Sequence, residues 1–210
     1  MDTRTFFDIM GTAPAAVTIV TTTDRLGRPQ GLTVAALCSV SADPPLLLVC
    51  IERRSRTLRA IRERGAFAVN FLSGEGKNVA ARFAETVPDR FDGLDWHPGR
   101  LGLPILDTVT LAHAECRTTE VLEAGDHVVL IALVEAGAAP APHTRPLMYF
   151  RHRFGPWPGE VEDARAGGEA EGPELSAQPR RSHGAGGNGA DEVTATAPHP
   201  DWLHAAHSRR

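Results

Sequence analysis

The pattern of apolar and polar positions before Pro158 predicts a chain made mostly of strands. Residues 17–23 form a β-branched run that stops at a turn containing Gly27, and an apolar pattern resumes over residues 31–40. Because β-branched residues favour strands and a turn separates the two runs, we predict a hairpin here. Residues 46–51 are all apolar, which predicts a short strand buried on both faces.

Two segments have the spacing of amphipathic helices. Residues 57–64 follow an N-cap at Ser55 or Thr57 and end before Gly65, as helices commonly do. Residues 77–84 form the second helix, and its apolar face consists of Val79, Ala80 and Phe83. Further strands are predicted over residues 67–72, 110–121, 126–135 and 147–150. Six or seven closely spaced strands with a few short helices indicate a mainly β fold, a closed or nearly closed antiparallel barrel.

The sequence changes character after Pro158. Residues 159–210 consist largely of Gly, Ala, Glu, Pro, Arg and His, with scarcely an aliphatic side chain. Such a segment cannot offset the entropy of ordering by burial, so we predict a folded domain of residues 1–158 and a disordered tail. Three tail glycines match the dinucleotide-binding pattern G-x-G-x-x-G, but no strand precedes them and no helix follows, so we reject that interpretation.

Charge and composition argue against two classes of partner. The net charge is −4, from 22 basic and 26 acidic residues, whereas a nucleic-acid-binding surface needs a basic excess. No stretch of about 18 apolar residues can span a bilayer, and the first residues lack the apolar core of a signal peptide. We therefore expect no nucleic acid, no membrane and a cytoplasmic location. The cysteines lie in apolar runs and are predicted to be small buried hydrophobes: Cys38, Cys50 and Cys116.

Hydroxyl and basic residues gather between Gly31 and Thr57. Thr33, Ser39 and Ser41 share one alternation of an extended chain, whose backbone amides could face a planar heteroaromatic ring; the alternative is a hairpin with solvated hydroxyls. The sequence Glu52-Arg-Arg-Ser-Arg-Thr then leads into a helix. Free amides, two hydroxyls and guanidinium groups make an anion site at such a terminus, and the alternative is an ordinary N-cap with a solvated basic face.

A tight turn, Glu123-Ala-Gly-Asp-His127, places a histidine at the start of a strand. With an unperturbed pKa of about 6.5, an imidazole there can donate a hydrogen bond to an amide or phosphate, or act as a general acid. The alternative is a merely exposed turn histidine. The sequence His113-Ala-Glu115-Cys116 matches the H-x-E of zinc deaminases, but the following P-C-x-x-C is missing, so we assign it to a strand and expect no metal.

Taken together, these motifs resemble the flavin reductase-like family, the reductase partners of two-component flavin monooxygenases. The resemblance runs in order from about Phe6 to Phe154, through VTIVTT, GLTV, CSVSADPPLLLVCI, FAVNFL, VAARFA, GDHVVLIALV and PLMYFR. It implies a split β-barrel of Greek-key topology that binds FMN or FAD and dimerises. It also implies an NAD(P)H:flavin oxidoreductase, which uses NADH or NADPH to supply reduced flavin to a separate flavin-dependent monooxygenase, a hydroxylase or a halogenase.

The resemblance assigns site residues by position. The segment along the isoalloxazine matches Thr33, Val34, Ala35, Ser39 and Val40. The phosphate-binding pair matches Ser55 and Thr57, with helpers at Arg53, Arg54 and Arg56. Residues beside the ribityl or adenylate end match Asn70, Phe71 and Phe83. The histidine close to the nicotinamide, our catalytic candidate, matches His127, and a segment near it matches Tyr149, Phe150 and Arg151.

Two departures from the family pattern affect the flavin site. Gly76 stands where members often have Gln, and Ala35 and Ala36 replace the usual alternating serines. Both changes remove side-chain contacts, so we expect a flavin that binds and leaves rather than a permanent prosthetic group. Two alternative functions stay open: an enzyme of this fold that keeps its FMN and acts on its own substrate, and a non-enzymatic module that binds flavin or haem.

Overall fold

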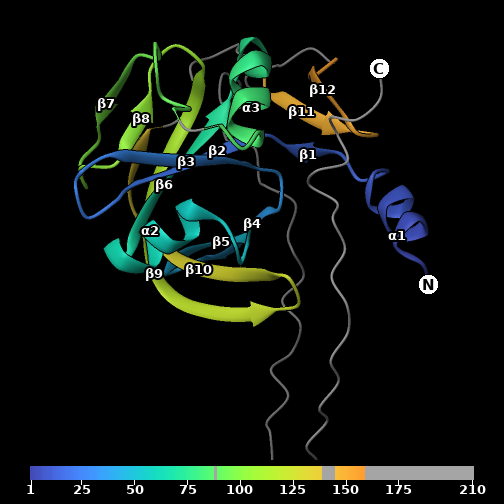
Figure 1. The fold of residues 1–210 in the computed structure, drawn as a ribbon, viewed down its shortest axis with the longest axis horizontal. Helices are drawn as coiled ribbons and strands as arrows, with labels where there is room; N and C mark the ends of the chain where they lie inside the picture. The colour runs from blue at the N-terminus through green and yellow to red at the C-terminus, as the bar shows by residue number, and fades with distance from the viewer. Residues whose placement is uncertain (88, 139–144, 159–210) are drawn as a thin grey trace, which may run out of the picture. The chain divides into compact units, whose positions relative to one another are not determined.

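Seven antiparallel strands form the main sheet of the structure, a computed structural model that describes residues 1–87, 89–138 and 145–158. Their order across the sheet is β3-β2-β6-β9-β10-β5-β4 (Figure 1). The strands are β2 (Thr18–Thr23), β3 (Pro29–Val34), β4 (Leu37–Ala42), β5 (Pro45–Glu52), β6 (Ala66–Leu72), β9 (Thr110–Ala124) and β10 (His127–Ala138).

The connection between β3 and β4 shows that this sheet curls into a barrel. These strands lie at opposite edges of the sheet, yet only Ala35 and Ala36 join them. A linker of two residues spans at most about 10 Å, so the two edges must come together. The backbone N–H of Cys50 donates to the carbonyl of Ala36 at 2.9 Å, which holds the linker against β5. The predicted, nearly closed antiparallel barrel is therefore confirmed.

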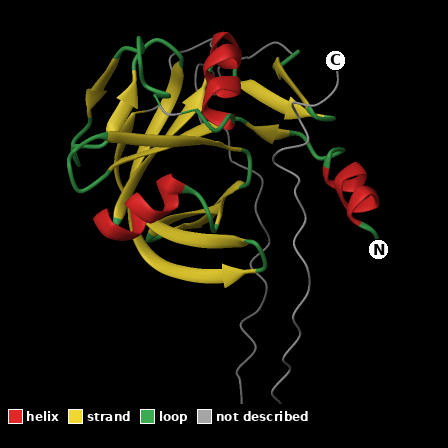
Figure 2. Cartoon of the chain, viewed as in Figure 1, coloured by secondary structure: helices red, strands yellow, loops and turns green. Residues whose placement is uncertain are grey.

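Both predicted helices are present with nearly the expected bounds. Helix α2 (Arg56–Arg64) begins after the N-cap Ser55 and ends at Gly65, whose φ of +72° suits a residue without a Cβ. Helix α3 (Lys77–Ala84) buries Ala80 and Phe83. Figure 2 shows how few helices accompany the strands.

Several short elements escaped the sequence analysis. A second sheet consists of β1 (Ala15–Ala16), β11 (Leu147–Phe150) and β12 (Arg153–Pro156), and a small hairpin consists of β7 (Trp96–Pro98) and β8 (Pro104–Leu106). The chain starts with α1 (Thr3–Met10), and a 3-10 turn, η1 (Gly74–Gly76), precedes α3. Apart from β11, which was predicted, and the eight-residue α1, these pieces have two to four residues and are too short for an apolar period to stand out.

Two apolar clusters form most of the core. The barrel interior holds Val20, Val49, Phe67 and Leu130, and α2 contributes Leu58 and Ile61 to the same cluster. A second cluster lies under α3 and β11, around Phe83 and Leu147. Helix α2 thus packs against the barrel interior, so that its N-terminus is held in place by burial of its apolar face.

Three sequence predictions need correction. The run 31–40 forms two strands at opposite barrel edges, because the chain crosses over at Ala35 and Ala36. Strand β5 buries only alternate residues completely, since its outer face meets no other element among the described residues. Of the cysteines, Cys116 is buried and burial raises the pKa of its thiol to about 12, but Cys38 is exposed on the edge strand β4.

Two further predictions concern membrane-spanning helices and the C-terminal tail. None of the described helices is long and apolar enough to cross a membrane. The predicted tail of residues 159–210 lies outside the described residues.

Candidate functional site

The N-terminus of α2 offers backbone donors at the surface of the barrel. The first amides of a helix have no partner within it, and the aligned peptide dipoles favour an anion there. Ser55 is the N-cap, and its Oγ accepts from the N–H of Leu58 at 3.4 Å. Thr57 is only 1% exposed, so it reaches this surface chiefly through its backbone. The N-cap interpretation of Ser55 is therefore confirmed, and the anion-site interpretation stays a prediction that is compatible with it.

The turn between β9 and β10 is docked beside this helix terminus. The N–H of Arg53 donates to the carbonyl of Asp126 at 3.0 Å, and its Nη1 donates to the carbonyl of Gly125 at 3.1 Å. Strand pairing sets His127 opposite Glu52. The structure therefore brings together the two motifs that the sequence places about 70 residues apart, the phosphate cap and the histidine turn.

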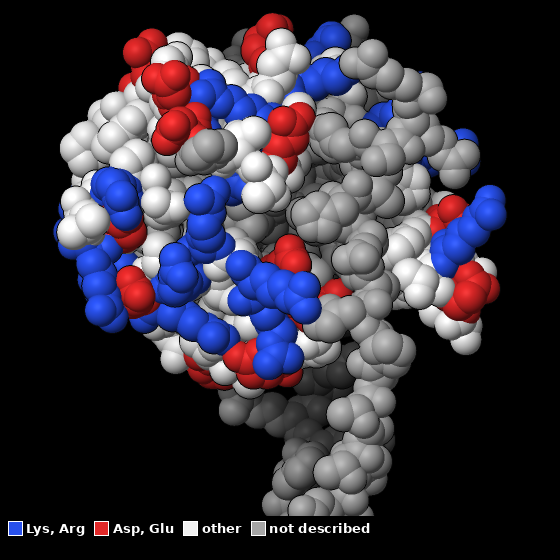
Figure 3. All heavy atoms as spheres, in the orientation of Figure 1, with Lys and Arg blue, Asp and Glu red and all other residues white. Residues whose placement is uncertain are grey.

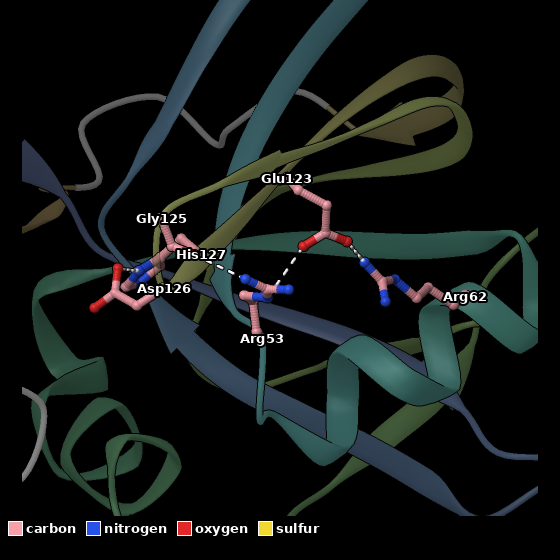
Figure 4. A network of polar contacts seen from close by, with 6 residues as sticks. All are labelled: Arg53, Arg62, Glu123, Gly125, Asp126 and His127. Atoms are coloured by element: carbon pink, nitrogen blue, oxygen red, sulfur yellow. Dashed lines mark hydrogen bonds and ion pairs between the residues drawn. The ribbon is translucent and has the colours of Figure 1, made fainter. Parts of the chain in front are cut away.

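One carboxylate links the loop before α2 to the helix itself. Glu123 pairs with the guanidinium of Arg53 at 3.1 Å and also with that of Arg62 from α2. Figure 4 shows the Glu123 carboxylate between these two guanidinium groups, with the turn and His127 on the far side of Arg53. The sequence analysis missed Glu123 and Arg62. The sequence did contain a signal for this pairing, since the segment of α2 is rich in arginine and the turn sequence begins with the acidic Glu123.

His127 is oriented by its own neighbour. Its Nδ1 lies 2.8 Å from Oδ1 of Asp126, and 18% of its side chain is exposed. A carboxylate at that distance favours the proton on Nδ1, which makes Nε2 of the neutral ring a hydrogen-bond acceptor. A neutral ring of this kind can accept from a carboxamide NH₂, and a protonated ring can donate to a phosphate. Asp126 is a third residue that the sequence pattern did not single out, after Glu123 and Arg62.

The residues predicted to line the isoalloxazine lie in two different strands, β3 and β4, and in the linker between them. Thr33 donates its hydroxyl to the carbonyl of Ala80 at 2.6 Å, and Val34 is buried in the barrel core. Ala35 lies at the crossover, while Ser39 and Val40 are exposed on β4, where a bulge interrupts the pairing with β5. Because β4 is an edge strand, its outer backbone groups can bind a planar ring, and the side chains of Thr33 and Val34 serve mainly the fold.

The residues assigned to the ribityl or adenylate end are mostly core residues. Asn70 is fully buried, and its carboxamide binds four partners: the carbonyl of Ile19, the N–H of Leu106, and the hydroxyls of Thr21 and Thr110. Phe83 is 1% exposed and packs edge-on against Phe91, with ring centroids 5.0 Å apart. Phe71 is partly buried against the barrel core. Asn70 and Phe83 are thus buried in the core, and Phe71 is the most accessible of the three.

The segment Tyr149, Phe150 and Arg151 lies in the second sheet, at the end of β11. Burial raises the pKa of Tyr149, whose ring packs against Phe154. Arg151 has a φ of +47°, and its guanidinium carbon lies 5.3 Å from the centre of the Phe150 ring. The left-handed backbone turns the chain sharply here and leaves Phe150 and Arg151 exposed.

The deaminase-like sequence has a structural role. Glu115 is buried and accepts from the backbone N–H groups of Arg100 and Leu101, at 2.7 and 2.6 Å. It thereby fixes the turn between β7 and β8. Among the described residues, no group of three or more His, Cys, Asp or Glu side chains is placed to hold a metal ion.

A nearly closed antiparallel barrel with a helix terminus next to a histidine turn agrees with the split-barrel class of flavin reductases. The sequence model of the flavin reductase like domain matches residues 10–158, and the chain belongs to that family. The family resemblance drawn from the motifs is thus confirmed.

Individual relatives agree with this assignment. A flavin reductase (NADH) of Kitasatospora aureofaciens is 51% identical over 166 residues, which cover 79% of this chain and 86% of the relative. The structure of nitrilotriacetate monooxygenase component B from Mycobacterium thermoresistibile matches with a TM-score of 0.71 and 35% identity, over 84% of this chain and 96% of that one. The NADH:FAD oxidoreductase SgcE6 of Streptomyces globisporus C-1027, solved with NAD and FAD fragments, matches with a TM-score of 0.68 and 29% identity, over 73% of this chain and 91% of that one.

Proposed function

We propose that the chain is an NAD(P)H:flavin oxidoreductase that supplies reduced FMN or FAD to a separate flavin-dependent monooxygenase. The observation that carries the proposal is the docking of the His127 turn on Arg53, which brings our candidate for the nicotinamide, His127, beside our candidate for the flavin phosphate, the α2 terminus. Membership of the flavin reductase like family supports it. NAD(P)H is available in the cytoplasm, where we place the protein.

The chain's residues need only bind and orient the two nucleotides. The flavin supplies the hydride-accepting chemistry, so the protein requires no nucleophile of its own. The α2 terminus and Ser55 bind the flavin phosphate, and backbone groups of β4 near Ser39 and Val40 bind the ring and stabilise its negative charge after reduction. His127 holds the nicotinamide carboxamide. The exposure of β4 and the alanines at 35 and 36 favour a flavin that binds and leaves.

Oxidation of NADH and NADPH, followed with and without added FMN, FAD or riboflavin, tests the proposal. A rate that depends on added flavin supports the reductase. A rate that persists in the purified protein without added flavin indicates the alternative enzyme that keeps its FMN. No oxidation under any condition indicates a binding module and overturns the proposal. Transfer of reduced flavin is tested by adding the protein to a flavin-dependent monooxygenase that lacks its own reductase and measuring product formation.

We also propose that two copies of the chain associate through the outer face of β5 and β10. Facing pairs on these strands place six apolar side chains on that face, all partly exposed: Leu46, Leu48, Cys50, Val129, Ile131 and Leu133. The outer face of an antiparallel sheet is normally polar, and a continuous apolar patch marks an interface. A second copy is the occupant that the family resemblance implies.

Sedimentation equilibrium tests this association. Ile131→Asp at the centre of the patch should convert a dimer into a monomer, because a buried unpaired charge is costly. Thr108→Asp, in an exposed turn away from the patch, is the matched control and should stay dimeric. A monomeric natural chain, or a dimeric Ile131→Asp variant, contradicts the proposal.

The division of the chain near residue 158 is a proposal as well. The family match ends at residue 158, and the composition changes there. Truncation after Pro158 should leave the flavin-dependent rate and the melting temperature unchanged. A large fall in either would show that residues 159–210 contribute to the folded protein.

A further inference from the structure

A cavity of about 430 Å³ lies between the β2–β3 turn and the outer face of α2. The turn and the start of β3 contribute Asp24, Arg25, Leu26, Arg28 and Gln30, and the helix contributes Arg56, Arg59, Ala60 and Glu63. The helix residues follow one another at intervals of three, one and three, so they form one face of α2. No residue that the sequence analysis assigned to a ligand lies in this cavity, except Arg56.

The lining has more positive than negative charge. Two of its arginines are paired within the cavity: Arg28 with Asp24 at 2.8 Å, and Arg25 with Glu63 at 3.2 Å. Arg59 has no ion pair or side-chain hydrogen bond among the described residues. Figure 3 shows Lys and Arg side chains gathered on this face, where Figure 1 places α2. The cavity is therefore electrostatically suited to an anion.

The cavity continues from the proposed flavin phosphate site. Arg56 is the first residue of α2, directly after Ser55, and its guanidinium donates to the carbonyl of Val87 at 3.2 Å. Arg90 lies close to Arg56, and burial together with this second guanidinium lowers the pKa of Arg90. The two cations lie close together although their hydrogen-bond partners are carbonyls, so a phosphate near Arg56 would relieve their repulsion.

We propose that this cavity binds the adenosine phosphate half of a dinucleotide, an inference that rests on the proposed reductase function. Its volume falls in the range of about 300–1,000 Å³ of small-molecule sites. Arg56 and Arg59 bind the phosphate. Leu26, which is 75% exposed, offers apolar surface to the adenine, and the Gln30 carboxamide can both donate to it and accept from it. Both FAD and NAD(P)H contain this group.

Isothermal titration calorimetry with FAD, FMN, NADH and AMP tests the inference without turnover. Arg59→Ala should weaken AMP binding about tenfold, as expected for the loss of a charge-assisted contact. If FAD is the source, its affinity falls with that of AMP while FMN affinity is unchanged. If the nicotinamide nucleotide is the source, NADH affinity falls and both flavins bind as before.

Two variants sharpen the measurement. Glu63→Gln should tighten binding of the same ligand, because it removes a negative charge and frees Arg25. Arg59→Lys should retain most of the affinity. Arg4→Ala, which removes an equal charge on the exposed face of α1, is the control and should change nothing.

The inference is overturned if Arg59→Ala leaves all four affinities unchanged, or if FAD and FMN lose affinity equally. It is separable from the reductase proposal. A chain that binds AMP through Arg59 but oxidises no NADH with any flavin would retain the adenylate cavity and contradict the reductase.

Discussion

Two polar clusters of the molecule contain similar side chains but are used differently. Near the α2 terminus, Arg53 pairs with Glu123 and bonds to the turn that carries the partly exposed His127. In the neighbouring strands β6 and β9, Asn70 and Glu115 are buried and bind mainly backbone groups. The first cluster keeps charged groups at the surface, whereas the polar atoms of the second cluster are hydrogen-bonded within the protein.

This difference distinguishes ligand sites from structural ones. A buried carboxamide or carboxylate with all its partners in the protein cannot bind a ligand without breaking those bonds, which costs about 1–3 kcal/mol for each group left unsatisfied. A surface imidazole or guanidinium can bind a ligand without leaving a buried group unsatisfied. Variants in the buried cluster should therefore change stability, and variants in the surface cluster should change binding and rate.

The largest effect is expected from Asn70→Ala. The substitution leaves the buried N–H of Leu106 without its partner at 3.0 Å and opens a void, so the free energy of unfolding should fall by about 3 kcal/mol. Urea unfolding measures the loss, and flavin affinity of the folded fraction should stay the same. Asn78→Ala, on the exposed side of α3, is the matched control. A stable Asn70→Ala protein with weak flavin binding would reverse our assignment.

His127→Ala should slow hydride transfer about 10–100-fold, which corresponds to about 1.4–2.7 kcal/mol of lost positioning. The Michaelis constant for NAD(P)H should rise, and flavin affinity should hardly change. Single-turnover measurement is preferred, since flavin release cannot mask the step. His97→Ala removes another histidine next to an aspartate, Asp107, and serves as the control. Loss of flavin binding with an unchanged nicotinamide constant would place His127 at the flavin instead.

Ser55 allows a smaller test of phosphate binding. Ser55→Gly removes the hydroxyl at a cost of only a few tenths of a kcal/mol to the cap, so it isolates the ligand contact better than alanine. FMN affinity should fall about fivefold, the worth of one ordinary hydrogen bond, and riboflavin affinity should not change. Calorimetric titration of both flavins gives the comparison. Equal losses for FMN and riboflavin would show that Ser55 does not contact the phosphate.

The smallest effect is expected at the exposed pair of Arg117 and Glu135. Hydrogen bonding from Arg117 lowers the pKa of Glu135. The pair therefore adds stability above the pKa of the unfolded carboxyl, about 4.3, and loses it as the pH falls through the folded value. Arg117→Ala should melt slightly below the natural chain at pH 7, and this gap should narrow as the pH falls below the unfolded value. A gap in melting temperature that widens in acid would contradict this.

Local signals in the sequence were sufficient for many elements. The β-branched run before Asp24, the cap at Ser55 with Gly65, and the apolar face of α3 each predicted an element that the structure contains. Such features depend on neighbours a few residues away, which the sequence displays directly. The motifs also sufficed to identify the family, since their order is a property of the chain alone.

Other features depended on contacts between distant segments. The sequence proposed His127 and Ser55 as separate candidates, but only the pairing of β5 with β10 places the histidine turn on Arg53 and sets Glu123 between two arginines. Likewise Asn70 and Phe83 matched family positions, yet packing makes them core residues here.

The sequence by itself thus determined most strands of the main sheet, the helices α2 and α3, and the family, because these follow from local propensity and motif order. The tertiary structure alone decided which polar residues are buried and which stay at the surface. Burial and hydrogen-bond saturation depend on the packing of the whole barrel. The crossover at Ala35 and Ala36, which joins strands at opposite edges of the sheet, is likewise a long-range arrangement that the local pattern of residues 31–40 does not indicate.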